Sequence, residues 1–275
     1  MSLFSIKDKI DTQMYRVFNV LSDAVFFLKC GTRAKVRHNK AYSGIHEGQR
    51  CFIVATGPSL GKLPKDYLDM LRGEVVFGVN SYYKAPVVDG IVPTYYLLMD
   101  NNYWGVSSKT FQEVFEKYYD QPPVFITDVR AYNFVPEGAK AIPLYAKNYP
   151  VLKMHDRLDG NLSIAMNVVG FAILSAIYMG FKEIYLLGSD YNLFCYREEN
   201  HCYDDKEEFS TLPTYNLAFY LKYYHLTTEF HYLLAKLARQ KGRRVVNLSV
   251  GSLLDAYPVE DPCNVLCGSC NEGNE

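Results

Sequence analysis

Short apolar runs alternate with longer amphipathic stretches from residue 51 onward. Seven runs have the length of a strand: Cys51–Ala55, Glu74–Val79, Tyr95–Met99, Val124–Thr127, Ala141–Tyr145, Glu183–Leu187 and Arg244–Leu248. Most are apolar throughout, as strands buried on both faces are. Helical patterns lie between several of them, most clearly at Leu68–Leu71, Thr110–Tyr119, Ser163–Met179 and Pro213–Gln240. The pattern predicts an α/β fold with a doubly wound, mostly parallel, Rossmann-like sheet of about seven strands.

The first 28 residues carry a different pattern. Apolar side chains recur every three or four positions, at Leu3, Ile6, Ile10, Met14, Val17, Leu21, Val25 and Leu28. This spacing predicts one amphipathic helix of about 25 residues. Five basic residues follow it: Lys29, Arg33, Lys35, Arg37 and Lys40. Two interpretations stay open: a helix packed on the domain with a solvated basic loop, or a contact with another copy or with an anionic membrane surface.

The chain divides into three parts on this evidence. We expect an N-terminal helical extension at residues 1–49, one α/β domain at 50–258 and an acidic, cysteine-containing tail at 259–275. The polar stretch Asn192–Pro213 is long for a connection in a compact domain, and stretches of this length are often lids or binding loops. We therefore expect a lid-like insertion after the strand that ends near Leu187.

The charge, the hydropathy and the cysteine content of the chain argue against several classes of protein. The 275 residues include 29 Lys and Arg against 30 Asp and Glu, a net charge of −1, which argues against nucleic-acid binding by a basic surface. No apolar run reaches 18 residues, and the N-terminus does not resemble a secretory signal, so we expect a cytoplasmic protein. The odd number of cysteines, seven, suits reduced thiols. The spacing of Cys263, Cys267 and Cys270 resembles a radical-SAM cluster motif, but its place in an acidic tail favours a frayed terminus.

Polar residues follow three of the predicted strands. The first strand runs into Thr56, Gly57, Pro58 and Ser59, a turn in which glycine permits close approach of a ligand and the hydroxyls can bind phosphate. Asn80 and Asp100 end the next two strands. In a doubly wound sheet ligands bind outside the carboxyl ends of the strands, so these residues are expected to converge on one crevice.

One histidine of the C-terminal half is a candidate proton acceptor. His225 lies within a predicted helix, and His231 lies on another face of it. The chain contains no H-E-x-x-H and no Asp-x-Asp motif, so we expect no metal site. From spacing alone His225 is a candidate base and equally a structural residue.

Taken in order, the motifs resemble a known family. Residues 53–60 (IVATGPSL), 77–80 (FGVN), 98–100 (LMD), 180–191 (GFKEIYLLGSDY) and 241–257 (KGRRVVNLSVGSLLDAY) resemble the bacterial sialyltransferases that cap lipooligosaccharides. They also resemble the wider superfamily of uncharacterised glycosyltransferase-like and 6-hydroxymethylpterin diphosphokinase-like proteins. The resemblance covers residues 50–258.

The sialyltransferase resemblance implies a metal-independent, inverting transfer of a sialic-acid-like sugar from a CMP-linked donor to a surface glycan or glycolipid, with no further cofactor. Counting back from Ser252–Leu254 places the family's general base at His225. Thr56, Gly57, Pro58, Ser59, Asn80, Asp100 and Asp190 fall where that family holds its nucleotide. Tyr196 or Tyr203 would bind the donor phosphate, and the turn around Ser163 and Asn167 would bind the sugar carboxylate.

Two departures keep alternatives open. Asp100 replaces an Asn of the sialyltransferases, and the family's Thr-Ser-Gly turn is absent near Ser163 and Asn167. A Mg²⁺- and ATP-dependent diphosphotransferase with Asp100 as a metal ligand, or a non-catalytic nucleotide-binding protein, remain as alternatives. Acceptors on lipid carriers would place residues 1–40 at the inner membrane face, and a homo-oligomer is also open.

Overall fold

The computed structural model describes residues 3–105, 109–147, 152, 154–163, 167–195, 201–206 and 215–266. At its centre is one sheet of eight parallel strands in the order β6-β5-β4-β3-β2-β1-β7-β8. The strands are β1 (Arg50–Val54), β2 (Val76–Val79), β3 (Tyr95–Leu98), β4 (Val124–Asp128), β5 (Ala141–Lys147), β6 (Asn161–Ser163), β7 (Glu183–Leu187) and β8 (Arg244–Asn247). The predicted doubly wound α/β fold is confirmed.

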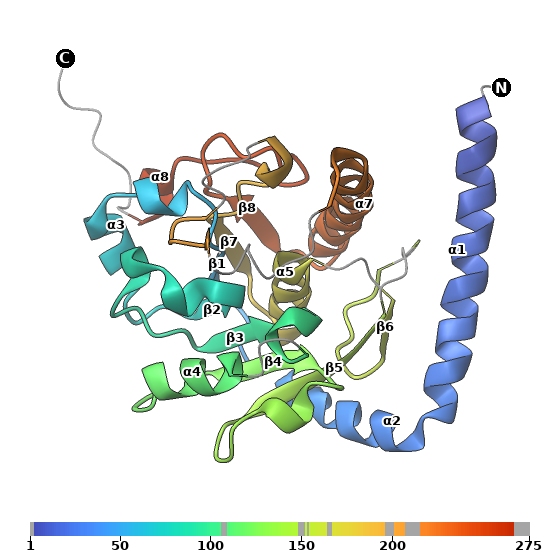
Figure 1. The fold of residues 1–275 in the computed structure, drawn as a ribbon, viewed down its shortest axis with the longest axis horizontal. Helices are drawn as coiled ribbons and strands as arrows, with labels where there is room; N and C mark the ends of the chain where they lie inside the picture. The colour runs from blue at the N-terminus through green and yellow to red at the C-terminus, as the bar shows by residue number, and fades with distance from the viewer. Residues whose placement is uncertain are drawn as a thin grey trace.

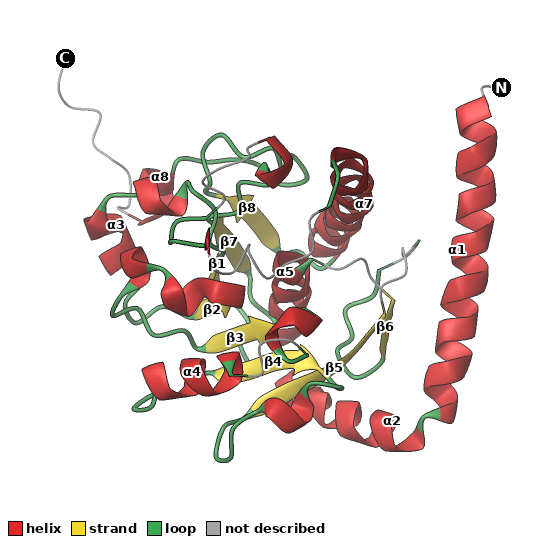
Figure 2. Ribbon diagram, in the orientation of Figure 1, coloured by secondary structure: helices red, strands yellow, loops and turns green. Residues whose placement is uncertain are grey.

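Helices cover both faces of the sheet (Figures 1 and 2). They are α1 (Leu3–Leu28), α2 (Cys30–Arg37), α3 (Lys65–Asp69), α4 (Thr110–Lys117), α5 (Val168–Met179), α7 (Leu217–Gln240) and α8 (Pro262–Leu266), with a 3-10 helix at His38–Tyr42. Alternate side chains of a strand enter opposite layers: Ile53 joins the core under α5 and α7, whereas Phe52 joins the core on the other face. The continuous apolar runs therefore mark strands buried on both sides.

Helix α5 is apolar on all sides because it is enclosed on all sides. Every residue from Gly170 to Met179 is buried, and the helix packs against both the sheet and α7. Gly170 allows the close approach of α7, since a Cβ there would lie 2.2 Å from Cε1 of Phe230. Gly180, at φ +95°, ends the helix in the left-handed conformation.

The sheet reverses direction of growth between β1 and β7. Strands β2 to β6 extend from one side of β1, and β7 and β8 extend from the other. Two glycines face each other at this switch point. The Gly57 N–H donates to the carbonyl of Gly188 at 2.9 Å, and a Cβ on Gly57 would lie 2.4 Å from the Gly188 oxygen. The chain thus needs glycine where the crevice opens.

Helix α1 extends along one edge of the molecule (Figure 1). Its C-terminal half is attached to the β5–β6 edge, where Asn161 donates to Ser22 at 3.0 Å and to Asp23 at 2.8 Å, and the Phe26 and Tyr145 rings lie 4.9 Å apart. The predicted helix over Leu3–Leu28 is confirmed. No helix of the described chain has the length and apolar character needed to cross a membrane.

Three features differ from the sequence expectations. Strand β6 was not predicted, because three residues of the pattern Asn-Leu-Ser carry no strand signal. Consequently Ser163 ends a strand instead of beginning the helix that starts at Val168.

Cys263 is disulfide-bonded, so the expectation of reduced thiols is wrong there, whereas Cys30, Cys51, Cys195 and Cys202 are free. Cys267 and Cys270 lie outside the described residues, and the three-part division of the chain stays a prediction.

Candidate functional site

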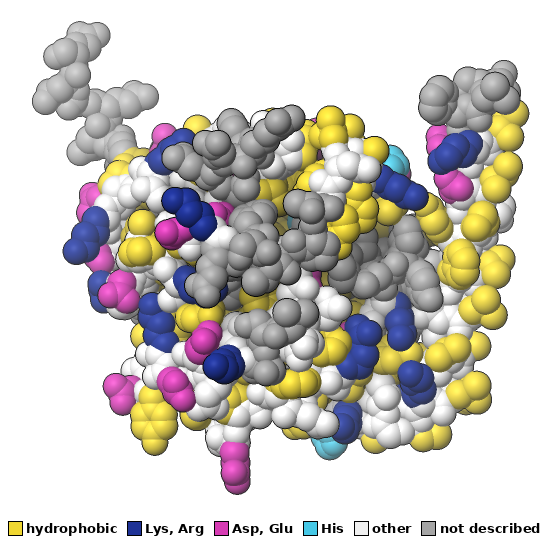
Figure 3. All heavy atoms as spheres, in the orientation of Figure 1, with side chains coloured by type: hydrophobic (Ala, Val, Ile, Leu, Met, Phe, Trp, Pro, Cys, Tyr) yellow, Lys and Arg dark blue, Asp and Glu magenta, His cyan; other side chains and the backbone are white. Residues whose placement is uncertain are grey.

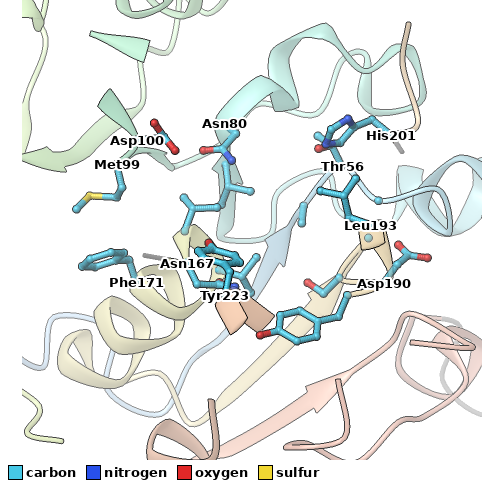
Figure 4. A pocket seen from close by; sticks show the side chains of 18 of the residues that line it. Thr56, Asn80, Met99, Asp100, Asn167, Phe171, Asp190, Leu193, His201 and Tyr223 are labelled. Atoms are coloured by element: carbon cyan, nitrogen blue, oxygen red, sulfur yellow. The ribbon is translucent and has the colours of Figure 1, made fainter. Parts of the chain in front are cut away.

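A cavity of about 500 Å³ opens at the carboxyl ends of the strands. The segments that follow β1, β2, β3, β4 and β7 line one side of the cavity. The first turn of α5 and the middle of α7 line the other side. Figure 4 shows the strand-end residues in sheet order, from Asp100 through Asn80 and Thr56 to Asp190, with Tyr223 and Asn167 below Asn80. The predicted crevice is therefore present, and Asn80 and Asp100 both reach it.

The turn after β1 is fastened to the end of β7. Asp190 accepts hydrogen bonds from the Ser59 backbone N–H at 3.1 Å and from the Ser59 hydroxyl at 2.8 Å. Its side chain lies where a Cβ of Gly57 would be, 2.0 Å from that position. Burial raises the pKa of the Asp190 carboxyl, and the Ser59 bonds oppose that rise. Asp190 and Ser59 therefore shape the turn by binding each other, and the Ser59 hydroxyl is not directed at a phosphate.

Two residues without glycine's freedom adopt positive φ at the cavity wall: Asn80 (+50°), after β2, and Tyr191 (+59°), after β7. The backbone of Asn80 is held by Tyr96, whose hydroxyl donates to the Asn80 carbonyl at 2.7 Å. The side-chain Oδ1 of Asn80 is buried and accepts no hydrogen bond within the described part of the chain. Strain together with an unsatisfied acceptor is typical of a position kept for ligand binding.

Helix α7 contributes aromatic and imidazole groups to the wall. Tyr223, Tyr224 and His231 line the cavity. Burial raises the pKa of both tyrosines, so at neutral pH they carry phenol O–H groups. His231 is fully buried, and its Nδ1 lies 3.0 Å from the Tyr257 hydroxyl, while Nε2 has no partner. Burial lowers the pKa of His231 to about 3, so this imidazole is neutral.

A second histidine lies at the mouth. His201 lines the cavity, and its Nδ1 lies 2.8 Å from Oδ2 of Asp205. An imidazole paired in this way is fixed in one orientation, and Nδ1 holds the proton in the neutral ring. The neighbouring Cys202 N–H donates to the Thr56 carbonyl at 2.9 Å, so residues 201–206 are attached to the turn after β1. Residues 196–200 and 207–213 of the predicted lid lie outside the described chain.

The other end of the cavity carries charge. Asp100 caps the turn after β3 by accepting from the Asn102 N–H at 2.9 Å. After β4, Arg130 donates to the buried Asp128 through Nε at 2.8 Å and through Nη2 at 3.0 Å, and its guanidinium lies 5.3 Å from the centre of the Trp104 ring. Among the described lining residues Arg130 is the one Lys or Arg.

Seven of the predicted site residues line this cavity: Thr56, Gly57, Pro58, Asn80, Asp100, Asn167 and Asp190. The Asn167 side chain is already used as a helix cap, because its Oδ1 accepts from the Gly170 N–H at 2.9 Å. Ser59 faces a smaller adjoining pocket with Lys62. Ser163 lies in β6, with its side chain outside the description, and Tyr196 lies outside the described residues.

The structure does not support His225 or Tyr203 as members of this cavity. The His225 side chain is 67% exposed, and its Nε2 lies 3.9 Å from Oε1 of Glu229. It does not line the cavity. On a helix, Tyr224 and His231 are seven residues apart and share a face, whereas His225 is turned about 100° from Tyr224. Tyr203 packs against the core on the face of the sheet that holds Phe52, and its ring stacks on that of His201 with the centroids 5.1 Å apart.

Sequence reasoning missed His201, Tyr223 and Tyr224 as lining residues, and it considered His231 only as a metal partner. The seven-residue spacing between Tyr224 and His231 was a signal for a shared face. Nothing in the local sequence places His201 against Thr56, since that contact depends on the path of the chain after β7. In the described part of the chain no group of three His, Cys, Asp or Glu side chains is arranged to hold a metal ion.

Comparison with known proteins adds a family. The model of the family described as "6-hydroxymethylpterin diphosphokinase MptE-like" matches residues 20–199. No curated protein matches the chain.

Three solved structures are similar at low identity. The MAf glycosyltransferase of Magnetospirillum magneticum AMB-1 has a TM-score of 0.49 at 14% identity, over 84% of this chain and 38% of the other, so this chain spans well under half of that protein. The sialyltransferase CstII of Campylobacter jejuni, in complex with a substrate analogue, cytidine-5'-monophosphate, has a TM-score of 0.44 at 14% identity, over 78% and 86%. The monofunctional alpha-2,3-sialyltransferase Cst-I of C. jejuni has 0.46 at 15%, over 79% and 82%.

Proposed function

The chain belongs to the 6-hydroxymethylpterin diphosphokinase MptE-like family, and we propose that it is a glycosyltransferase that takes a sialic-acid-like sugar from a CMP-linked donor. The donor nucleotide would lie at the carboxyl ends of β1, β2 and β7. The acceptor would be a surface glycan or glycolipid, entering from the side of β3 and β4. The proposed transfer inverts the anomeric carbon and needs no metal.

The charge balance of the cavity is the observation that carries this proposal. Three carboxylates line the cavity, from Asp100, Asp128 and Asp190, and two of them are committed to Arg130 and Ser59. An ATP triphosphate would bring about four negative charges beside these carboxylates, and anions of that charge are normally met by Lys, Arg or Mg²⁺. A CMP-linked acidic sugar brings two negative charges, one on the phosphodiester and one on the sugar carboxylate, and suits this wall better.

The end of the cavity at β1 and β2, where the donor nucleotide is placed, contains an unsatisfied hydrogen-bond acceptor. The Gly57 turn lines the cavity at the end of β1. The buried Oδ1 of Asn80 is an acceptor without a partner, and the exocyclic amino group of cytosine is a donor of the matching kind. We therefore assign base recognition to Asn80.

The chemistry would be a direct displacement at the anomeric carbon. His201, oriented by Asp205, would take the proton from the acceptor hydroxyl through Nε2, because Nδ1 is engaged by the carboxylate. The O–H groups of Tyr223 and Tyr224 would donate hydrogen bonds to the departing phosphate and stabilise its growing charge. This replaces the sequence-based assignment of the base to His225 and of the phosphate contact to Tyr203.

A diphosphotransferase is the second candidate, and the family's description together with the position of Asp100 favours it. Asp100 lines the cavity beside Asn80 (Figure 4) and its carboxylate is committed to the Asn102 N–H alone among the described contacts. In that reaction Asp100 would bind Mg²⁺, the metal would screen the ATP phosphates, and a pterin alcohol would be the acceptor.

The exposed stripe of α1 extends the proposal to the membrane surface. Large apolar side chains project from it: Ile6, Ile10, Met14, Val17, Phe18, Val20, Leu21, Val25, Phe27 and Leu28. Figure 3 shows hydrophobic side chains along the outer edge of α1. Residues 3–42 carry eight Lys and Arg against three Asp. We propose that this segment holds the enzyme on an anionic inner-leaflet surface, where acceptors on lipid carriers are found.

A thermal-shift panel tests the proposed ligand. CMP, CDP, UDP, GDP and ATP are added separately at saturating concentration, each in EDTA and in Mg²⁺. CMP in EDTA is expected to raise the Tm, because a ligand that binds only the folded chain stabilises it by mass action. Stabilisation by ATP that requires Mg²⁺, with CMP inactive, would replace the glycosyltransferase with the diphosphotransferase.

A further inference from the structure

The β3–β4 end of the cavity contains an arginine held in a fixed orientation. The carboxylate of Asp128 is 2% exposed and binds the Arg130 guanidinium through Nε and Nη2, and it also accepts the Arg130 backbone N–H at 2.8 Å. The Trp104 ring lies against the guanidinium. The Arg130 side chain remains 58% exposed at the cavity. The residue is therefore preorganised but open to a ligand.

Two donors at this end lack a protein acceptor. The Trp104 Nε1–H is buried and has no hydrogen-bond acceptor among the described residues. Arg130 donates to Asp128 through Nε and through Nη2. Its third guanidinium nitrogen, Nη1, has no acceptor among the described contacts. A buried indole N–H without a partner costs free energy unless a ligand supplies an oxygen. An oxyanion bound at this end of the cavity can accept from Nη1 of Arg130 and from the indole N–H of Trp104.

We propose that Arg130 and Trp104 form a subsite for the carboxylate of an acidic sugar in the acceptor, such as a uronic acid residue. This inference rests on the proposed function and names the acceptor class. A carboxylate is favoured over a phosphate dianion because Asp128 already offsets the charge of the guanidinium, which leaves directed N–H groups rather than a strong positive field.

The position of the pair assigns it to the acceptor. Strand β4 is three strands from β1 in the sheet, and at about 4.8 Å per strand the two ends of the cavity are about 14 Å apart. The Gly57 turn and Asn80 occupy the other end, where the donor nucleotide is placed. Asp100 follows β3, which lies between β4 and β2 in the sheet, and it lines the cavity.

The chain offers a matched control for Arg130. Arg157 binds the buried Asp159 in the same way, through Nε at 3.0 Å and Nη2 at 3.0 Å, and its side chain is 62% exposed. Arg157 does not line the cavity. Replacing either arginine by Gln breaks the same kind of ion pair, but only Arg130→Gln removes a donor from the subsite. Trp104→Phe keeps a flat ring there and removes the N–H.

Binding of methyl glucuronide and methyl glucoside is compared by saturation-transfer NMR titration in the presence of CMP. We expect the acid to bind about tenfold more tightly or better, as hydrogen bonds to a charged group predict. Arg130→Gln should reduce this preference to within about twofold and Trp104→Phe should reduce it severalfold, while Arg157→Gln should keep it.

Equal binding of the two sugars, binding of neither, or an acid preference that survives in Arg130→Gln would overturn the subsite. The Tm shift by CMP is measured on the same samples. If CMP stabilises the chain and the sugars are not distinguished, this inference fails alone. If CMP has no effect either, the proposed donor fails with it.

Discussion

Asp190 accepts hydrogen bonds from both the backbone N–H and the hydroxyl of Ser59, at 3.1 and 2.8 Å. These bonds join the turn after β1 to the end of β7 at the switch point of the sheet. Because the Asp190 side chain occupies the space that a Cβ of residue 57 would need, the glycine, the serine and the aspartate form one unit. The crevice is shaped by this unit before any ligand binds.

The Asp190–Ser59 pair predicts a pH-dependent stability. Burial raises the pKa of Asp190 above its unfolded value, so the folded state favours the protonated form. Its contribution to the free energy of unfolding is therefore greatest below the unfolded pKa of about 3.9 and declines as pH rises through the folded pKa. The stability of the wild type relative to Asp190→Asn should fall over this window in urea titrations. A difference that is constant with pH, or that grows as pH rises, would contradict this account.

Asn80 should separate backbone strain from ligand binding. Asn80→Gly retains the φ of +50° at little cost, whereas Asn80→Ala should be less stable by about 1 kcal/mol because alanine resists this conformation. Both variants lose the unpaired Oδ1, so both should bind CMP about 3- to 10-fold more weakly by calorimetry, the worth of one net hydrogen bond. Wild-type affinity in Asn80→Gly would remove Asn80 from base recognition.

His201 and His225 make opposite predictions for turnover. His201→Gln should lower kcat by about 10² to 10⁴-fold, the usual contribution of a positioned base. Asp205→Asn should lower kcat less, because it keeps the imidazole and removes only the carboxylate that orients it. His225→Gln is the control on the exposed face of α7 and should stay within about twofold of the wild type. A large loss in His225→Gln with normal turnover in His201→Gln would restore the assignment made from the sequence.

His231 predicts acid sensitivity of the fold. Burial lowers its pKa from 6.5 to about 3, so the stability it supports is complete above pH 6.5 and is lost as pH falls toward 3. In this window the unfolded chain binds one more proton, and the free energy of unfolding should fall by about 1.4 kcal/mol per pH unit. His231→Phe should show a shallower slope by about that amount. Identical slopes would mean that the imidazole is not buried as described.

The stripe of α1 predicts binding to anionic vesicles. Replacing Met14 and Leu21 by Ser removes two exposed apolar side chains (50% and 55% exposed) that make no part of the core, so the fold should keep its Tm. Co-sedimentation with vesicles of anionic lipid should drop at least tenfold relative to the wild type. Gln13→Ser, on the same helix, is the control. Unchanged sedimentation, or a concentration-dependent dimer that the double variant abolishes, would assign the stripe to another copy of the chain.

Most of the fold was predictable because buried parallel strands are continuous apolar runs, as at Cys51–Ala55 and Glu183–Leu187. Strand β6 was not, since its Asn161-Leu162-Ser163 sequence has neither the length nor the apolar character of the others. Polar strand ends such as Asn80 and Asp100 could be placed in the crevice because parallel strands end at one edge. The residues that we propose for catalysis were harder to predict from the sequence. An ungapped count led to His225, one position from the wall residue Tyr224, and the contact of Cys202 with Thr56 joins residues far apart in the chain.

Release of CMP from CMP-N-acetylneuraminate in EDTA tests the central claim most directly, because it requires the proposed donor and no metal. With an acidic glycan acceptor present, the wild type should release CMP and form a glycosidic product, both visible by phosphorus and proton NMR. His201→Gln should release CMP at least 10²-fold more slowly. If the donor stays intact while ATP, in the presence of Mg²⁺, is converted to AMP and its diphosphate group passes to a pterin alcohol, the chain is a diphosphotransferase and the glycosyltransferase account is wrong.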